Sequence, residues 1–497
     1  MTTSTSSPEN SALVSQETEL RLAEAKGYVS YRIRHTLASR FSFLIICLAI
    51  ILSALAYGTV HAWALAVFYL GSVVLLVLWV ADSWSLGTVR LSKNMLQLPL
   101  IGVLALGLVQ LLPLRNPDSG GTLLPLVRSL SFDPYATRFI VIEVIALLIY
   151  LAATLVFVDT PKRLRLLVRT ITVFGFVLAI FGLTQSFASP TRVYWVRELP
   201  QSQAFGPFIN RHHFAGYMEL TMALPLGLIF SNSVEREKKF IYLFAAGLMA
   251  VALVMTNSRG GIVSLVAELL FLVSLMGIKR RHRKKHTEKK PRIKSAALKA
   301  GLALAMVIAI FGGVVLLGGE DALTRIVGSV NADDPTTGRA HFWGVTVDII
   351  KNHPVIGTGL GAFGVVYTGY DTRNGLSRLE QAHNDYLQVL SDGGIVGAVL
   401  GLVFLAALFR MGFARRESRD DFRRGVATGA LAGCFAVLVH SFFDFTLHTT
   451  SNTLLFLILA ALATMNGRVE EVHSRRKKKR RESTNGNPQM AEPAPVT

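Results

Sequence analysis

The sequence predicts an all-α membrane protein with about twelve transmembrane helices. The 497 residues are 51% hydrophobic, and long apolar runs recur through most of the chain. The basic residues are also unevenly distributed: alternate links hold 37 Lys and Arg residues on one side of the predicted membrane and 12 on the other. An excess of Lys and Arg marks the cytoplasmic side, so both termini are expected in the cytoplasm and the number of helices should be even.

The predicted spans divide the chain into five segments. A polar cytoplasmic segment, 1–40, precedes helices 1–9 within 41–318, and a large periplasmic loop and helix cap, 319–383, precedes helices 10–12 within 384–467. The basic tail, 468–497, is rich in polar residues and is expected to be disordered. The spans are residues 41–58, 61–80, 95–113, 138–158, 166–187, 214–230, 240–256, 261–278, 297–318, 385–409, 425–443 and 453–466.

The net charge of +19 would also suit a nucleic-acid-binding protein. However, the densest basic runs, 279–285 and 475–481, both fall on the predicted cytoplasmic side, close to helix ends. Basic residues in such positions orient a membrane protein and attract anionic lipid, so no nucleic-acid partner is expected. Cys47 and Cys434 lie inside predicted helices, which argues against a disulfide framework.

The loop before the tenth span has local structure of its own. Residues 339–352 have the pattern of an amphipathic helix, and Pro354 prevents this helix from continuing. Four glycines at 357, 359, 361 and 364 then predict a tight turn with an accessible backbone.

Two arginines on the predicted outer side are candidates for binding an anion. Arg259 stands in a short link before Gly260 and Gly261, where open backbone N–H groups favour anions, although an arginine at this depth can also reach lipid phosphate. Arg339 opens the amphipathic helix, close to Phe342, and could grip a diphosphate through two hydrogen bonds. The alternative for Arg339 is a position in the lipid headgroup layer.

His383 is the strongest candidate for a general base. It lies at the expected boundary between water and lipid, and Asn384 after it is a suitable N-cap for a helix beginning at Asp385. A neutral imidazole there could accept a proton, although His383 could also serve only to cap the start of the helix. His440 and Asp444 are one helical turn apart and could form a hydrogen-bonded pair facing the same cavity, in a catalytic or a structural role.

Metal chemistry has little support in the sequence. His212 and His213 are adjacent, so on a helix they point about 100° apart, and no third ligand has a suitable spacing. Phosphate-binding, dinucleotide-binding and zinc-protease motifs are lacking. We therefore expect neither a metal nor another cofactor.

Five segments, taken in order, resemble the bacterial O-antigen ligase and O-antigen polymerase superfamily of membrane glycosyltransferases. Their order and spacing agree over about residues 200–400, and the large loop before the His-Asn helix agrees as well. One departure is Asp392, where the family often has Glu, and this change keeps the carboxylate. The segments are residues 205–216, 257–261, 338–339, 353–363 and 382–387.

The resemblance implies a glycan donor carried on a polyprenyl diphosphate and an inverting transfer that uses no metal, on the periplasmic face of the inner membrane. Arg259 and Arg339, with Arg211 as a third cation, would bind the diphosphate, and His383 would activate an acceptor hydroxyl. Asn384, His440, Asp444 and Asn210 would support these groups. These roles suit the residue types, because a diphosphate leaving group needs fixed cations and an attacking hydroxyl needs a base.

Several alternatives remain open at this point. An O-antigen ligase, a polysaccharide polymerase and a protein O-oligosaccharyltransferase would differ in the acceptor, which could be a lipid, a glycan or a protein. A small-solute transporter is an alternative of another class, for which broken helices and charges within the membrane would be expected. The predicted spans hold few such charges, chiefly Glu143 and Glu219, and this favours the transferase.

Overall fold

The computed structural model describes residues 35–114, 128–199, 204–277, 339–373 and 379–466, together with Val469. Within these ranges the chain is mainly helical, with one antiparallel hairpin of β1 (Arg192–Val193) and β2 (Arg197–Glu198). The helices are α2 (Leu37–Leu55), η1 (Tyr57–Thr59), α3 (Ala62–Leu86), α4 (Gln97–Gln110), α5 (Pro134–Phe157), α6 (Pro161–Ala188), α7 (Arg211–Phe230), α8 (Arg236–Met255), α9 (Arg259–Gly277), α11 (Arg339–Asn352), α12 (Phe363–Tyr370), α13 (Asp385–Arg415), α14 (Asp421–His440), η3 (Thr446–His448) and α15 (Thr450–Thr464).

The predicted all-α membrane class is confirmed. Among the described residues, eight helices are long and apolar enough to cross a membrane, and α4 and α15 are apolar but shorter. Each predicted span in the described ranges overlaps a helix. The ninth, 297–318, lies outside them, as do most of segments 1–40 and 468–497 and residues 319–338 of the cap, so the count of twelve stays a prediction.

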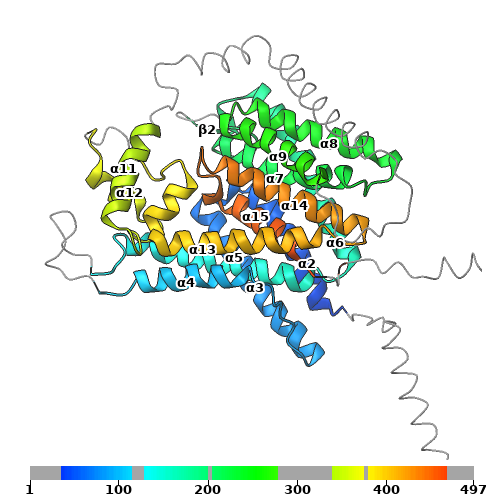
Figure 1. Cartoon of the computed structure of the whole chain (residues 1–497), viewed down its shortest axis with the longest axis horizontal. Helices are drawn as coiled ribbons and strands as arrows, with labels where there is room; N and C mark the ends of the chain where they lie inside the picture. The colour runs from blue at the N-terminus through cyan, green and yellow to red at the C-terminus, as the bar shows by residue number, and fades with distance from the viewer. Residues whose placement is uncertain are drawn as a thin grey trace, which may run out of the picture.

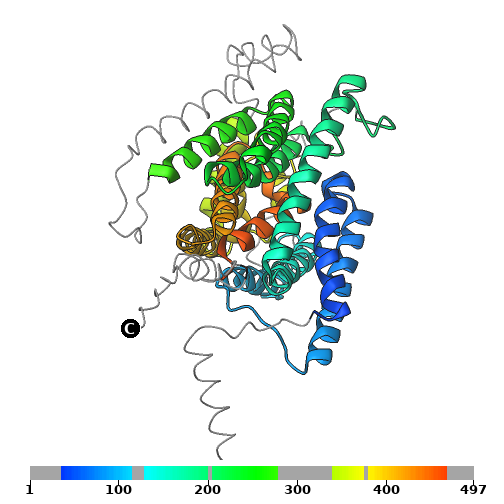
Figure 2. The same cartoon turned by 90° about the vertical axis from the view of Figure 1, so that its right-hand side faces the viewer.

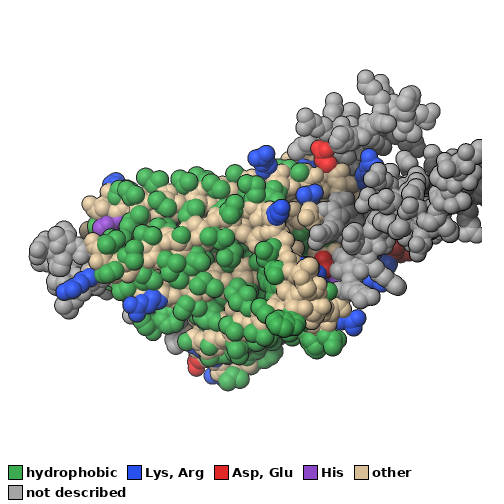
Figure 3. All heavy atoms as spheres, turned by 90° about the horizontal axis from the view of Figure 1, so that it is seen from below, with side chains coloured by type: hydrophobic (Ala, Val, Ile, Leu, Met, Phe, Trp, Pro, Cys, Tyr) green, Lys and Arg blue, Asp and Glu red, His purple; other side chains and the backbone are tan. Residues whose placement is uncertain are grey.

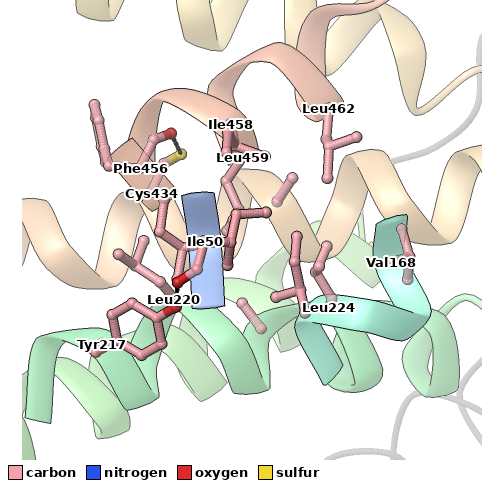
Figure 4. Packing of buried hydrophobic residues seen from close by; sticks show 14 of the residues in the cluster. Ile50, Val168, Tyr217, Leu220, Leu224, Cys434, Phe456, Ile458, Leu459 and Leu462 are labelled. Atoms are coloured by element: carbon pink, nitrogen blue, oxygen red, sulfur yellow. Dashed lines mark hydrogen bonds between the residues drawn. The ribbon is translucent and has the colours of Figure 1, made fainter. Parts of the chain in front are cut away.

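Helix α7 forms the centre of the bundle, and its whole apolar window is buried. Small residues let it approach α14 closely: a Cβ atom on Gly227 would come within 2.3 Å of the Gly429 backbone. Such contacts are typical of membrane helices, which gain stability from close packing. Figure 4 shows the adjoining apolar core, where Tyr217 Oη donates a 3.0 Å hydrogen bond to the Ile50 carbonyl.

The outer surface suits a lipid environment. Hydrophobic side chains cover most of the face shown in Figure 3, with scattered Lys and Arg. Large apolar side chains on α3 are open to the surroundings, including Leu70, Val77 and Val80, each more than 60% exposed. A surface of this kind would be unusual in water, so it supports burial in a bilayer.

Helices α11 and α12 pack together at one end of the bundle, beside the beginning of α13 (Figure 1). Figure 2, a view turned by 90°, shows α2 and α3 side by side at the edge of the bundle. The predicted helix over 339–352 is confirmed as α11, and the chain turns at Pro354. The turn that follows has positive φ angles at Gly357, Gly359 and Gly361.

Helix α13 begins as predicted, because the Asn384 side chain accepts hydrogen bonds from the Tyr386 and Leu387 N–H groups. It is broken at Gly394, where φ is +61° and ψ is −158°. The backbone of residues 354–359 lies against this break. Four hydrogen bonds of 2.8–3.1 Å close it: Ile395 N–H to Pro354 O, Val396 N–H to Val355 O, Thr358 N–H to Ser391 O and Gly359 N–H to Asp392 O.

Candidate active site

Asp444 joins two of the predicted site residues at the α11–α12 end of the bundle. Its Oδ1 atom lies 3.3 Å from His383 Nδ1, and its Oδ2 atom accepts a 3.2 Å hydrogen bond from Arg339 Nη2. The Asp444 side chain is 1% exposed, whereas those of His383 and Arg339 are 30% and 21% exposed. A buried carboxylate thus holds a histidine and an arginine that both remain open to a ligand.

The charge of Asp444 is fixed by its neighbours. Burial alone would raise the pKa of this carboxyl, but the hydrogen bond from His383 and the charge of Arg339 hold the pKa well below its usual range. Its Oδ1 atom also accepts a 2.9 Å hydrogen bond from the Phe445 N–H group. An ionised Asp444 favours the His383 tautomer that carries its proton on Nδ1, which leaves Nε2 able to accept another proton.

His383 is held in an uncommon backbone conformation with φ of +51°. The left-handed backbone conformation costs a residue other than glycine about 1–3 kcal/mol unless its surroundings compensate, and residues in this conformation are common at functional sites. Its ring packs edge-on against Phe445 at 4.8 Å and stacks near Phe342 at 6.2 Å. The aromatic contacts and the Asp444 hydrogen bond therefore fix both the position and the orientation of the imidazole.

Ser258 connects this cluster to the start of α9. Its hydroxyl lies 2.9 Å from His212 Nδ1 and 3.3 Å from His440 Nε2, and it accepts a 3.1 Å hydrogen bond from the Gly261 N–H group. His212 Nδ1 in turn lies 3.8 Å from Asp444 Oδ2. Asn257, just before Ser258, also has a positive φ of +54°. The start of α9 is thus positioned by two histidines from other helices.

His440 does not form the predicted side-chain pair with Asp444. Helix α14 ends at His440, three residues before the predicted end of this span, and Asp444 lies in the following turn. The His440 Nδ1 atom instead bonds Glu219 Oε1 on α7 at 2.8 Å, and both side chains are 0% exposed. The two residues share one site, but each has a different partner, because the chain turns away where the helix was expected to continue.

The remaining predicted residues lie near the same cluster. Asn210 caps α7 by accepting a 2.9 Å hydrogen bond from the His212 N–H group, and its Nδ2 atom lies 3.4 Å from His213 Nε2. Arg211 is the first residue of α7 and is half-buried, whereas Arg259 is the first residue of α9 and is exposed. Both arginines therefore start helices whose first turns contact the cluster.

Sequence reasoning missed several polar residues of this region. Ser258 and Glu219 were not assigned to the site, and neither was the Asp385–His448 pair, whose Oδ1 and Nδ1 atoms are 2.7 Å apart. Glu268 on α9 is fully buried, and its carboxyl oxygens have no hydrogen-bond partner among the described residues. For Glu219 and Glu268 the sequence did offer a signal, because a carboxylate within an apolar run is a functional candidate in a membrane helix.

No group of three or more His, Cys, Asp or Glu residues in the described ranges could hold a metal ion. His212 and His213 have separate environments: His212 lies beside Ser258, and His213 Nδ1 bonds Thr449 Oγ1 at 2.6 Å. The adjacent histidines thus serve two different contacts.

The fold and the cluster define a polytopic membrane protein with an imidazole, carboxylate and guanidinium site at one end of its helix bundle. The family model described as O-antigen ligase matches residues 244–402, which confirms the resemblance to this superfamily seen in the sequence. This stretch contains Arg259, Arg339 and His383 but ends before Asp444. No curated protein matches the chain. Over this stretch the chain is therefore similar to O-antigen ligases.

Proposed function

We propose that the protein is a glycosyltransferase that moves a glycan from a polyprenyl diphosphate to an acceptor hydroxyl on the periplasmic face of the inner membrane. The observation that carries this proposal is the convergence of His383 and Arg339 on buried Asp444. A base and a cation held within one hydrogen-bonded cluster suit a reaction in which a hydroxyl attacks and a phosphate leaves.

His383 would accept the proton of the acceptor hydroxyl at Nε2, while Asp444 stabilises the imidazolium that forms. The acceptor oxygen forms a bond to the anomeric carbon as the bond from that carbon to the phosphate oxygen breaks. Attack from the face opposite the diphosphate inverts this carbon. The imidazolium then releases its proton to water, so that the base is restored.

Arg339, Arg259 and Arg211 would neutralise the departing diphosphate. A guanidinium stays protonated and matches phosphate oxygens with paired donors, which suits a leaving group that has no metal to balance its charge. Arg339 contacts Asp444 through Nη2, so this atom links the diphosphate side of the site to the base. Arg259 adds its charge at the positive end of α9.

A small-solute transporter is the alternative with specific support. The break in α13 and the buried carboxyls of Glu219 and Glu268 are features expected of transporters. Against this, the break is closed by backbone hydrogen bonds from residues 354–359, and Glu219 is paired with His440. The base-and-cation cluster also has no evident use in transport, so the transferase remains the better proposal.

Purified protein in proteoliposomes should release polyprenyl diphosphate from a polyprenyl-diphosphate-linked oligosaccharide only when an acceptor is present. Mass spectrometry of the lipid products and the elongated acceptor would measure the transfer. Glycolipid, oligosaccharide and peptide acceptors would separate a ligase, a polymerase and a protein glycosyltransferase. Uptake of free sugar without consumption of the donor would favour the transporter.

The charge distribution predicts the orientation of the chain. A reporter fused after residue 285 should report a cytoplasmic location, and a reporter fused near residue 330 should report a periplasmic one. The reason is that ten Lys and Arg residues lie in 279–294, whereas only five lie in the longer stretch 319–383. Both fusion points fall outside the described residues. Paired reporters that are active on opposite sides would measure this. Two fusions on the same side would refute the proposed topology.

A further inference from the structure

A second polar region, made of residues outside the Asp444 cluster, lies in a cavity of about 290 Å³ between α4, α5, α13 and the η3–α15 turn. Most of its wall is apolar. The wall residues from α4 and α5 include Val103, Leu106, Ile140, Val144 and Leu147. The cavity therefore has the character of a site for hydrocarbon along much of its length.

Missing side chains on α13 keep this cavity open. Gly397 and Gly401 are one helical turn apart and both line it. A Cβ atom on Gly401 would meet no atom within 4 Å, and one on Gly397 would make only ordinary contacts, with Val389 O at 3.4 Å and Leu106 at 3.8 Å. These glycines differ from Gly227 and Gly429, which let two helices touch, because here the space above the glycines is left unfilled.

One part of the cavity carries hydrogen-bond acceptors. Asp392 is 5% exposed, and its Oδ2 atom accepts hydrogen bonds from the Gly361 N–H group at 3.0 Å and from Gln388 Nε2 at 3.2 Å. Its Oδ1 atom is buried and has no partner among the described residues, and the same holds for Gln381 Oε1. A buried acceptor without a donor is costly, so a ligand that brings donors would be stabilised here.

The chemical groups of this polar part restrict the ligand. Glu143 and Asp392 both line the cavity, and Glu143 accepts a 2.7 Å hydrogen bond from Thr450 Oγ1. His448 also lines it but is paired with Asp385. Two carboxyl groups disfavour a diphosphate, whereas sugar hydroxyls would donate to carboxylate and amide oxygens. The donor's head group is thus a poor fit, and a hydroxyl-rich head is a good one.

The polar part of the cavity is close to the base in the chain and in space. Gln381 precedes His383 by two residues. The Phe445 ring packs against His383 at 4.8 Å and lies 6.5 Å from the ring of His448. Phe445 is thus a neighbour of both the base and a residue of the cavity wall, so a ligand in the cavity could extend a hydroxyl past this ring toward His383.

We propose that this cavity binds the acceptor, and that the acceptor is an amphiphile with a hydroxyl-rich glycan head and a hydrocarbon anchor. The head lies at Asp392 and Gln381, and the hydrocarbon follows the face of Gly397 and Gly401. This inference rests on the proposed function, because it assigns the acceptor of that reaction. It makes Asp392, in the position where the superfamily often has Glu, a contact to the acceptor.

Two variants test the cavity directly. Gly401→Leu fills the cavity without a clash at Cβ, and its matched control is Gly247→Leu on α8, where a Cβ would likewise meet nothing within 4 Å. Asp392→Asn keeps the size of the side chain but replaces one acceptor with a donor. A lost hydrogen bond to a charged group corresponds to about a tenfold weaker affinity or more.

The experiment uses the full-length protein in proteoliposomes with two photoactivatable probes, a glycolipid with a diazirine in its acyl chain and a polyprenyl phosphate with a diazirine in its chain. The glycolipid should label peptides of residues 385–402, and Gly401→Leu and Asp392→Asn should reduce this labelling about tenfold or more, while Gly247→Leu should not. In transfer assays, the same two variants should raise the KM for the glycolipid and leave the KM for the donor unchanged.

Preferential labelling of this segment by the polyprenyl probe would overturn the assignment and would identify the cavity as the binding site of the donor's polyprenyl group. An absence of labelling by both probes would refute a lipid site altogether. Specific glycolipid labelling in a protein that transfers no glycan would support the binding site while the proposed function fails. The outcomes for the site and for the reaction are therefore distinguishable.

Discussion

Replacement of His383 with alanine should slow glycan transfer about 100-fold or more while donor binding is retained, because the acceptor hydroxyl loses its base. The ionised Asp444 should hold the imidazole in position at neutral and mildly acid pH, since the pKa of this carboxyl lies well below the usual value. Single-turnover rates and a separate donor-binding measurement would test the expected effect of the variant.

The backbone conformation at residue 383 calls for a second variant. With φ at +51°, alanine would add strain that has nothing to do with proton transfer. Asparagine tolerates this region better, so His383→Asn should fold well and still lose the rate of transfer. His61→Ala, in the link between α2 and α3 where His61 contacts Tyr57 and Arg197, is the matched control. A His383→Asn enzyme with the normal rate would leave the base unassigned, with His440 the next candidate.

Loss of either arginine should strongly reduce transfer, but Arg339 and Arg259 should differ in how they fail. Removal of a fixed cation from a developing phosphate charge costs about 3–4 kcal/mol in a site that excludes water. Arg259→Ala should chiefly weaken binding of the polyprenyl diphosphate donor. Arg339→Ala should also slow the transfer of bound donor, because Arg339 shares Asp444 with His383.

The KM for the donor and the single-turnover rates of both arginine variants would measure this difference. Lysine should restore little activity at either position, since it cannot offer paired donors. Arg192→Ala is a suitable control, because Arg192 is half exposed and lies in the β hairpin opposite Glu198. Full activity of Arg339→Ala would move this arginine to the lipid headgroup layer and remove it from the mechanism.

The sequence predicted those features that depend on neighbouring residues. Apolar runs located the helices, Asn384 marked the start of α13, and Pro354 marked the turn after α11. Each of these signals acts within one or two turns of chain. The family match covers the segment from which Arg259, Arg339 and His383 were chosen.

Pairings between distant residues could not be obtained in this way. Asp444 contacts His383 and Arg339, which lie 61 and 105 residues earlier in the chain. Spacing suggested His440 as its partner instead, because residues four apart share a helix face. The true partner of His440 is Glu219 on α7, and only the packing of α14 against α7 brings them together.

The backbone hydrogen bonds across the break in α13 also determine how this end of the molecule can move. Residues 354–359 and the chain on either side of Gly394 satisfy each other's polar groups, so neither can separate without exposing four amides. Exposure of that kind makes opening cooperative, and the four amides should exchange their hydrogens as a single unit. The turn after α11 and the first turns of α13 consequently form one mechanical element. A glycan that displaces α11 would therefore also shift the first turns of α13. The position of the His383 imidazole, just before α13, would then change although the glycan does not touch it.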